Sequence, residues 1–241
     1  MSQIASQQNP RLKALRRLHT KQGRLRSGRF IAEGEDLVAA AARAGRLPVE
    51  GYRLSGSGTG EEGFHDVEAA ALASVSTLGS STRVIGVYEQ LWQEPLGPLC
   101  VYLHGVGDPG NVGTILRSAQ AFGASCVALG PGCADPHGPK AVRASMGAIF
   151  SSRLARAHDP SALPGERIAL AAGRGEPLAA GSGGEVTLLI GSERDGLPAE
   201  VISACERVAQ IPIATESLNA AMAATVALYE MTRGSSRVRS S

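Results

Sequence analysis

Three glycines that follow a predicted strand form the first candidate for a ligand site. Gly105, Gly107 and Gly110 have the GxGxxG spacing, and a helical pattern begins directly after them. In this context the spacing is typical of a dinucleotide-binding loop, whose backbone amides approach a pyrophosphate. Such a site also needs an acid at the end of the second strand, but Leu129 is followed by Gly-Pro-Gly and the nearest acid is Asp135. The pattern therefore favours a turn with a helix cap over a nicotinamide or flavin site.

A concentration of positive charge near the start of the chain is the second candidate. Residues 1–32 contain no acid and eight cations, namely Arg11, Lys13, Arg16, Arg17, Lys21, Arg24, Arg26 and Arg29. Because the whole chain carries +2 and this segment +8, the remainder carries −6. Closely placed cations favour a polyanion, since each phosphate contact releases counterions. A solvated basic arm without a partner is the alternative.

Composition sets the class of protein in which these candidates lie. The chain has 241 residues, of which 43% are hydrophobic and 19% charged, and this excludes a disordered or fibrous protein. Its apolar runs are far shorter than the ~20 residues of a transmembrane helix, and its polar start does not resemble a secretory signal. We therefore expect no membrane association and a cytoplasmic location. The four cysteines form no CxxC pair, so we expect no metal site.

The elements that must position these residues are predicted from periodicity. In the first part of the chain, residues 11–18 form an amphipathic helix with Leu12, Leu15 and Leu18 on one face. Strands are predicted at 30–33, 49–54 and 84–88, and helices at 34–44 and 66–73. These elements indicate a small α/β unit, joined to the rest of the chain by a linker at 92–98.

The remainder alternates short apolar strands with helices. Strands are predicted at 99–103, 126–129, 168–172, 187–190 and 209–213, and helices at 112–122, 140–145, 198–206 and 217–231. This alternation predicts a mainly parallel sheet covered on both faces. Ligands bind such sheets at the carboxyl ends of the strands, so the loops at 104–111, 191–197 and 214–219 are the places to look for function.

Three segments in these loops resemble, in order, the motifs of a known family. They are DPGNVGTILRSAQAFGA (108–124), LLIGSERDGLP (188–198) and IPIATESLNAAMAATVALYE (211–230). Together they resemble the SpoU or TrmH family of RNA ribose 2'-O-methyltransferases, which use S-adenosylmethionine. KAVRASMGAIF (140–150) is similar to the family's stretch between the first two motifs. The segment beginning at Asn9 resembles the ribosomal-protein-like substrate-binding domain of many members, so the resemblance covers residues 9–233.

The resemblance implies an α/β fold with two domains. A SpoU-type catalytic domain at 99–241 would have a parallel sheet and a deep C-terminal trefoil knot. A small α/β RNA-binding domain of ribosomal-protein type would precede it at 1–92. Composition and periodicity do not indicate a knot, and the general rule against knots argues the other way. The family also implies a homodimer formed through the catalytic domain.

The same resemblance assigns the site residues. The positions that match catalytic residues are Asn111, Arg117, Glu193, Ser217 and Asn219, and those that match cofactor-binding residues are Gly191, Ile211 and Leu218. Arg117 corresponds to the arginine regarded in the family as activating the ribose hydroxyl, although a guanidinium with a pKa above ~12 is a poor base. It can instead stabilise a developing alkoxide or position a phosphate. Asp108 or Asn111 can also cap the helix that carries Arg117, Ser217 or Asn219 can cap the last helix, and Glu193 can hold Arg117 or a backbone amide.

The implied activity is methyl transfer from S-adenosylmethionine to RNA, with the eight cations of residues 1–32 as RNA-binding residues. We expect large-subunit (23S) ribosomal RNA as the substrate. Transfer RNA is the main competitor, because the motifs define the reaction better than they define the RNA. A noncatalytic RNA-binding assembly factor of the same fold is the alternative from another class. Both housekeeping modification and antibiotic resistance are compatible with this activity.

Overall fold

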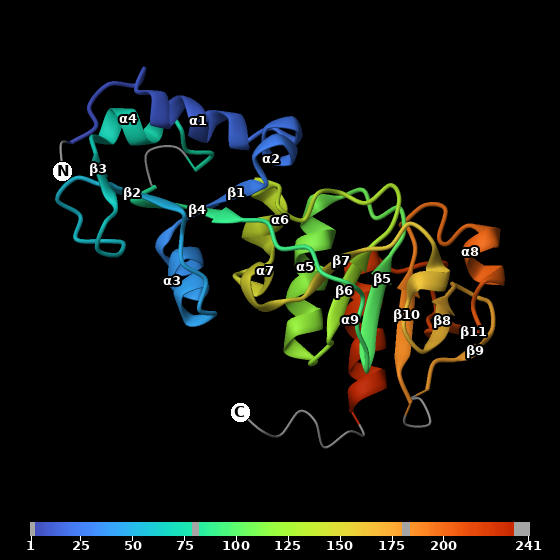
Figure 1. Ribbon diagram of the computed structural model, residues 1–241. Coiled ribbons are helices and arrows are strands. Elements are labelled where there is room, and N and C mark those ends of the chain that lie inside the picture. Colours follow the sequence, from blue (N-terminus) through green and yellow to red (C-terminus); the bar gives the residue numbers. More distant parts are fainter. Residues whose placement is uncertain (1–2, 79–81, 180–183, 234–241) are drawn as a thin grey trace. The chain divides into compact units, whose positions relative to one another are not determined.

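The computed structural model describes residues 3–78, 82–179 and 184–233 (Figure 1). The chain divides into two compact units, which we call the N-terminal unit (1–90 with 135–151) and the C-terminal unit (91–134 with 152–241). The ends of the expected domains, at 1–2 and 234–241, lie outside the described residues. Within the described ranges, none of the helices combines the length and apolar character that crossing a bilayer requires.

A four-stranded sheet forms the centre of the N-terminal unit. Its order is β1 (Arg29–Glu33), β4 (Val84–Glu89), β2 (Glu50–Leu54) and β3 (His65–Val67). The β1–β4 and β2–β4 pairs are antiparallel, whereas β2 and β3 are parallel. The helix predicted from residue 66 begins later, as α4 (Ala69–Ala73), because residues 65–67 pair with β2.

Two basic helices open this unit. In α1 (Pro10–Leu18), Asn9 accepts a hydrogen bond from the Arg11 amide at 2.9 Å, and the predicted leucine face is buried. A second helix, α2 (Lys21–Ser27), was not predicted. The Thr20 hydroxyl caps it through the Gly23 amide at 3.0 Å, and Gly28 ends it with a φ of 65° that suits glycine.

Residues 135–151 belong to the N-terminal unit, although the expected domain 99–241 includes them. This segment contains α6 (Pro139–Ala144), which packs on β1, and α7 (Ala148–Ser151), which packs on α3 (Glu35–Arg43). Phe150 also stacks on Phe30 of β1, with ring centroids 5.9 Å apart. Aromatic packing thus explains why the segment leaves the C-terminal unit.

The C-terminal unit is built on a seven-stranded sheet in which every strand pair is parallel. Its order is β7 (Leu154–Arg156), β6 (Cys126–Leu129), β5 (Leu99–Leu103), β10 (Val186–Ile190), β8 (Glu166–Leu170), β11 (Arg207–Gln210) and β9 (Glu176–Pro177). The prediction of a parallel sheet is confirmed. The two edge strands β7 and β9 were missed, since they have three and two residues.

Two long helices of the C-terminal unit pack against each other (Figure 1). They are α5 (Pro109–Ala121) and α9 (Ala220–Thr232), and the Ser118 and Thr225 hydroxyls join them at 2.7 Å. Two shorter helical segments, η2 (Pro160–Ala162) and α8 (Ala199–Ser203), complete the unit. The strands end at one edge of the sheet, so the loops after β5, β10 and β11 can meet there.

Candidate functional site

The start of α5 is fixed by Asp108 rather than by Asn111. The Asp108 carboxylate accepts a hydrogen bond from the Asn111 backbone amide at 2.9 Å, which makes Asp108 the N-cap. The helix therefore begins at Pro109, three residues earlier than predicted. Asn111 lies inside the first turn, and its side-chain amide remains available for other contacts. Of the two residues expected as possible caps of this helix, Asp108 is therefore confirmed and Asn111 is wrong.

Three polar side chains from distant parts of the chain form a connected row, which we call the amide cluster: Asn111 in the first turn of α5, Glu193 in the loop after β10 and Asn219 at the start of α9. The Asn111 side-chain amide donates to the Glu193 carboxylate. The Asn219 side-chain amide donates to Asn111 Oδ1 at 3.1 Å. Asn219 Oδ1 in turn accepts from the backbone amides of Ala221 at 2.9 Å and Met222 at 3.3 Å, which caps α9. Each amide thus has its orientation set by a partner on both sides.

The loop after β10 approaches its own backbone closely. The amides and carbonyls of Ser192 and Gly196 exchange hydrogen bonds of 3.1 and 3.2 Å, and the Ser192 hydroxyl accepts from the Asp195 amide at 3.1 Å. A Cβ at Gly191 would lie only 2.1 Å from the Gly196 carbonyl carbon. Glycine is therefore required at position 191 by the fold of this loop.

A cavity of about 410 Å³ opens beside this loop, and we call it the strand-end cavity. Residues at the ends of β8 and β10 line it, together with the three predicted cofactor-binding residues, Gly191, Ile211 and Leu218. Glu193 and Ser217 also line it, so it adjoins the amide cluster. Its remaining charged residues are Arg174, Arg194, Asp195 and Glu216. With Glu193, the lining thus contains three carboxylates and two guanidinium groups.

The predicted catalytic residues are brought together only in part. Asn111, Glu193 and Asn219 share hydrogen bonds, and Ser217 lies in the cavity wall with its carbonyl 3.4 Å from the Thr215 hydroxyl. Arg117 is exposed on α5, and within the described parts of the chain no hydrogen bond or ion pair joins it to that cluster.

Two charged residues of the cavity were not predicted. Arg174 and Glu216 line it, and although Glu216 lies in the loop 214–219 that was expected to carry function, no periodic pattern singles out either residue. Beside the first motif, the Tyr102 hydroxyl lies 3.2 Å from His104 Nδ1. Burial raises the pKa of Tyr102 to about 12, so this hydroxyl stays protonated at neutral pH.

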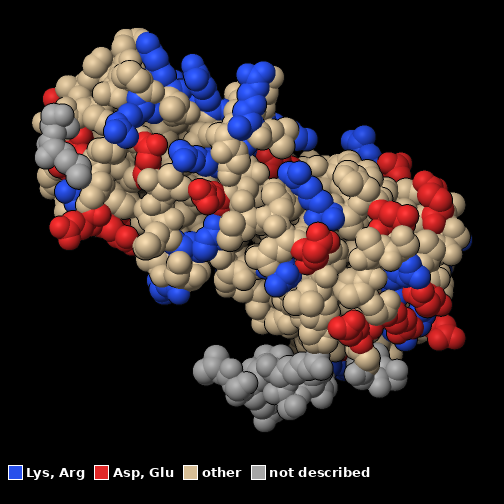
Figure 2. Space-filling model, viewed as in Figure 1, with Lys and Arg blue, Asp and Glu red and all other residues tan. Residues whose placement is uncertain are grey.

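The eight basic residues of the first segment fall into different environments. Figure 2 shows Lys and Arg side chains standing out over α1 and α2. Lys13, Arg17, Lys21 and Arg26 are exposed there. Arg11 and Arg29 approach the Glu50 carboxylate, at 3.2 and 3.8 Å.

Two of the eight are held inside the unit. Arg24 is 5% exposed, and it donates to Asp135 at 2.8 Å and to the Leu18 and His19 carbonyls at 2.8 and 3.0 Å. The prediction that Arg24 binds RNA is wrong in physical terms, because its donors are occupied and solvent does not reach them. Arg16 is half-buried and donates to Ser74 and to the Gln7 carbonyl, so its guanidinium is also largely engaged.

Comparison with known protein families matches both units. Residues 98–229 match the SpoU rRNA Methylase family, and residues 9–86 match the MRM3-like substrate binding domain. The first match covers more than half of the chain.

Similar whole proteins are found as well. An uncharacterized tRNA/rRNA methyltransferase of Synechocystis is 32% identical over 97% of this chain and 94% of its own length. The 23S rRNA (guanosine(2553)-2'-O)-methyltransferase RlmP of Bacillus subtilis is 30% identical over 96% and 99%. The AdoMet-bound rRNA methyltransferase of Sinorhizobium meliloti superposes with a TM-score of 0.84, at 29% identity, over 96% of this chain and 97% of that one.

Proposed function

The chain belongs to the SpoU rRNA Methylase family, and from that premise we propose that it transfers a methyl group from S-adenosylmethionine to a ribose 2'-hydroxyl of 23S ribosomal RNA. The names of the Bacillus and Sinorhizobium relatives support the reaction, the RNA and the methyl donor. The observation that carries the proposal is the amide cluster, which joins the three motifs by hydrogen bonds and reaches the strand-end cavity through Glu193.

The strand-end cavity suits the methyl donor. Its volume of about 410 Å³ lies within the ~300–1,000 Å³ common for small-molecule sites. Ile211 and Leu218 supply apolar walls for an adenine ring, and the backbone at Gly191 supplies hydrogen-bonding groups. The donor carries a sulfonium and an ammonium against one carboxylate, so an excess of carboxylates in the lining is complementary. When bound, S-adenosylmethionine supplies an electrophilic methyl group.

The residues around the cavity then have distinct tasks. A ribose hydroxyl is a poor nucleophile at neutral pH, so it must be placed in line and its proton removed or its charge dispersed. Asn111 and Asn219 orient polar groups through their fixed amides, and Glu193 holds Asn111 in place. We assign Ser217 to hydrogen bonding at the cavity wall. Arg117 stabilises the developing alkoxide or positions a phosphate, and among the described residues no hydrogen bond or ion pair competes for its guanidinium.

We also propose the domain organisation that the family implies. Residues 1–92 form the RNA-binding domain and residues 99–241 the catalytic domain, including a trefoil knot at the C-terminal helix. The matched ranges 9–86 and 98–229 support this division. We further propose that the protein acts in the cytoplasm, where the ribosomal RNA that it modifies is found.

A homodimer through the catalytic domain is part of the proposal. Met222, Val226 and Tyr229 of α9 are 63%, 42% and 54% exposed. Their spacing of four and three residues puts them on one helix face, which forms an apolar stripe. Such a stripe on a helix surface is typical of a protein interface.

The direct test measures methyl transfer from labelled S-adenosylmethionine to unmodified total RNA, separated into ribosomal and transfer RNA. We expect label on a ribose of 23S RNA, and loss of label in Asn111→Ala. Thr114→Ala, which changes an exposed residue one turn further along α5, is the matched control and retains activity. Label in transfer RNA instead would favour the competing substrate. Cofactor binding without any label would favour the noncatalytic assembly factor.

A further inference from the structure

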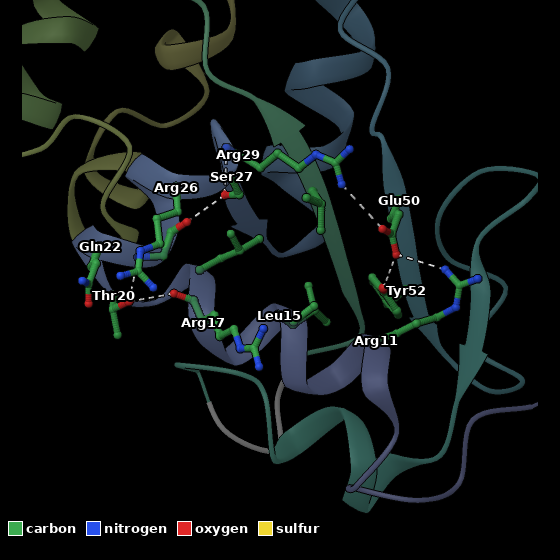
Figure 3. Close-up of a pocket in the computed structure, with 14 residues that line it drawn as sticks. Arg11, Leu15, Arg17, Thr20, Gln22, Arg26, Ser27, Arg29, Glu50 and Tyr52 are labelled. Atoms are coloured by element: carbon green, nitrogen blue, oxygen red, sulfur yellow. Dashed lines mark hydrogen bonds and ion pairs between the residues drawn. The ribbon is translucent and has the colours of Figure 1, made fainter.

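A second cavity lies in the N-terminal unit, and we call it the basic cavity. It has a volume of about 460 Å³ and lies between α1, α2 and the strands β2 and β4. Figure 3 shows Arg17 of α1, Gln22 and Arg26 of α2 and Thr20, which caps α2, around it, together with a group formed by Glu50 and Tyr52. The side chains of Leu15, Leu18 and Val87, all buried, form its apolar floor.

The charged groups of this cavity are strongly unequal in sign. Four arginines line it, namely Arg11, Arg17, Arg26 and Arg29, against one carboxylate, Glu50. Glu50 accepts from the Tyr52 hydroxyl at 2.5 Å and from Arg11 at 3.2 Å, and Arg29 lies 3.8 Å from its other oxygen. Burial, aided by the bond to Glu50, raises the pKa of Tyr52, so this hydroxyl remains a donor.

Arg17 and Arg26 differ from the other two arginines. Both are exposed, and neither forms an ion pair with a carboxylate in the described residues. Two unpaired guanidinium groups at the rim of one cavity favour a phosphate, because a guanidinium fork matches two phosphate oxygens. Leu15, Leu18 and Val87 in addition favour a flat apolar group of the same ligand, placed next to that phosphate.

An unpaired nucleotide can offer both groups to the cavity, a phosphate for the arginines and a flat base for the apolar floor. A base-paired nucleotide can offer only its phosphate. In a duplex the base is stacked between its neighbours, so only the phosphates could reach the arginines. A nucleotide turned out of the stack could place its base over the apolar floor while its phosphate stays at the rim. The cavity volume falls in the range of small-ligand sites.

We propose that the basic cavity binds one unpaired, unstacked nucleotide of the RNA, at a place separate from the methylated ribose. Arg17 and Arg26 hold its phosphate, and Leu15, Leu18 and Val87 contact its base. Glu50 Oε1, whose arginine lies at 3.8 Å, accepts from an N–H group of the base. The inference rests on the proposed function in that it takes RNA as the substrate, and it adds that this RNA carries a bulged or looped-out nucleotide.

The test compares two fluorescent RNA duplexes of the same sequence, one with a single bulged nucleotide, by anisotropy with the full chain. The wild-type protein is expected to bind the bulged duplex about tenfold more tightly. Arg17→Gln with Arg26→Gln removes two charges inside the cavity and abolishes this preference. Lys13→Gln with Lys21→Gln removes two charges from the same helices outside it. This matched pair weakens binding to both duplexes and lowers the salt dependence, but keeps the preference.

A second variant tests whether the preference depends on the open volume of the cavity rather than on its charge. Ala14 lines the cavity and is exposed on α1, so Ala14→Phe fills the cavity without changing charge or the core. We expect it to bind the paired duplex as the wild type does and to lose the tenfold preference. Glu50→Gln, which still accepts from Tyr52, reduces the preference by a smaller factor.

Failure of this inference is distinguishable from failure of the proposed function. A wild-type protein that methylates 23S RNA but binds the two duplexes equally overturns the cavity assignment alone. A preference that survives in Ala14→Phe and in the Arg17/Arg26 pair also overturns it. A wild-type protein that binds neither duplex and transfers no methyl group overturns both. Displacement of the bulged RNA by a mononucleotide at equal concentration would overturn the assignment to RNA in favour of a free nucleotide.

Discussion

The basic cavity and the strand-end cavity are close in size, at about 460 and 410 Å³, but they are built differently. Long side chains on helices enclose the first, with four arginines against one carboxylate. Backbone at the ends of parallel strands encloses much of the second, with three carboxylates against two arginines. The difference in charge matches a polyanion in one unit and a cationic methyl donor in the other.

Because the two cavities are built differently, we expect them to respond differently to substitutions in their walls. Arginine side chains reach their ligand through flexible stems, so removing one weakens binding in a graded, salt-dependent way. Backbone atoms that form a cavity wall cannot move aside without shifting the loop, so a single added methyl group lowers stability and ligand affinity. Substitutions at Arg24, Arg117, Gly191 and Glu206 test this contrast, and the expected losses decrease in that order.

Arg24 is the one residue of the basic segment whose removal is expected to lower stability sharply rather than to weaken ligand binding gradually. Arg24→Gln leaves Asp135, which is 16% exposed, without its cation, and we expect a loss of ~3–5 kcal/mol in the free energy of unfolding. Arg26→Gln, two residues away and exposed, should change that free energy by no more than ~0.5 kcal/mol. Chemical denaturation of both variants measures this. Equal stability of the two would contradict the structural role of Arg24.

Removal of Arg117 tests the catalytic unit without touching its cavity. Arg117→Ala is expected to lower kcat about 10²–10³-fold, equivalent to ~3–4 kcal/mol, because one donor to the developing charge is lost. Folding and the affinity for S-adenosylmethionine should be retained, since Arg117 is exposed and does not line the cavity. Single-turnover methylation and calorimetry measure the two quantities. An unchanged rate would remove Arg117 from the mechanism.

Gly191→Ala sharpens the contrast between the two walls. Its Cβ would meet backbone atoms at 2.1–2.4 Å, so the loop must shift, at a cost of ~1–3 kcal/mol. We expect lower stability and a clear loss of cofactor affinity, measured by thermal unfolding and calorimetry. Gly184→Ala is the matched control, because its Cβ would enter open space. If both variants bind the cofactor normally, the wall is softer than its geometry indicates.

The smallest effect is expected at the end of the sheet away from the cavity. Hydrogen bonds from the Arg167 side chain and backbone lower the pKa of Glu206 from 4.5 to about 2. A depressed carboxylate stabilises the fold above pH 4.5, and the contribution is lost as the pH falls through about 2. Glu206→Gln should therefore cost ~0.2–1 kcal/mol at pH 7, since the pair is exposed, and this difference should shrink as the pH falls through about 2. Thermal melts across pH would show a constant difference if another group were responsible.

Local patterns predicted the parts of the molecule that local forces determine. The leucine face of α1 and the buried strands at 99–103, 126–129 and 187–190 follow from periodicity. The amide cluster was expected only through resemblance, because Asn111 and Asn219 are 108 residues apart. Periodicity could not reveal the burial of Arg24 either, since its partner lies 111 residues further along. Arg117 lies outside the cluster because it follows Asn111 by six residues on α5, and at about 100° per residue this puts it on a different face of the helix.

The cap of α9 also determines the order in which the two functional surfaces can form during synthesis. Asn219 both begins the last described helix and completes the amide cluster, so that cluster cannot exist until residues after 219 have been made. The N-terminal unit needs nothing beyond residue 151, once Asp135 has reached Arg24. During synthesis there is accordingly an interval in which the nascent protein already has its basic surface and not yet its catalytic one.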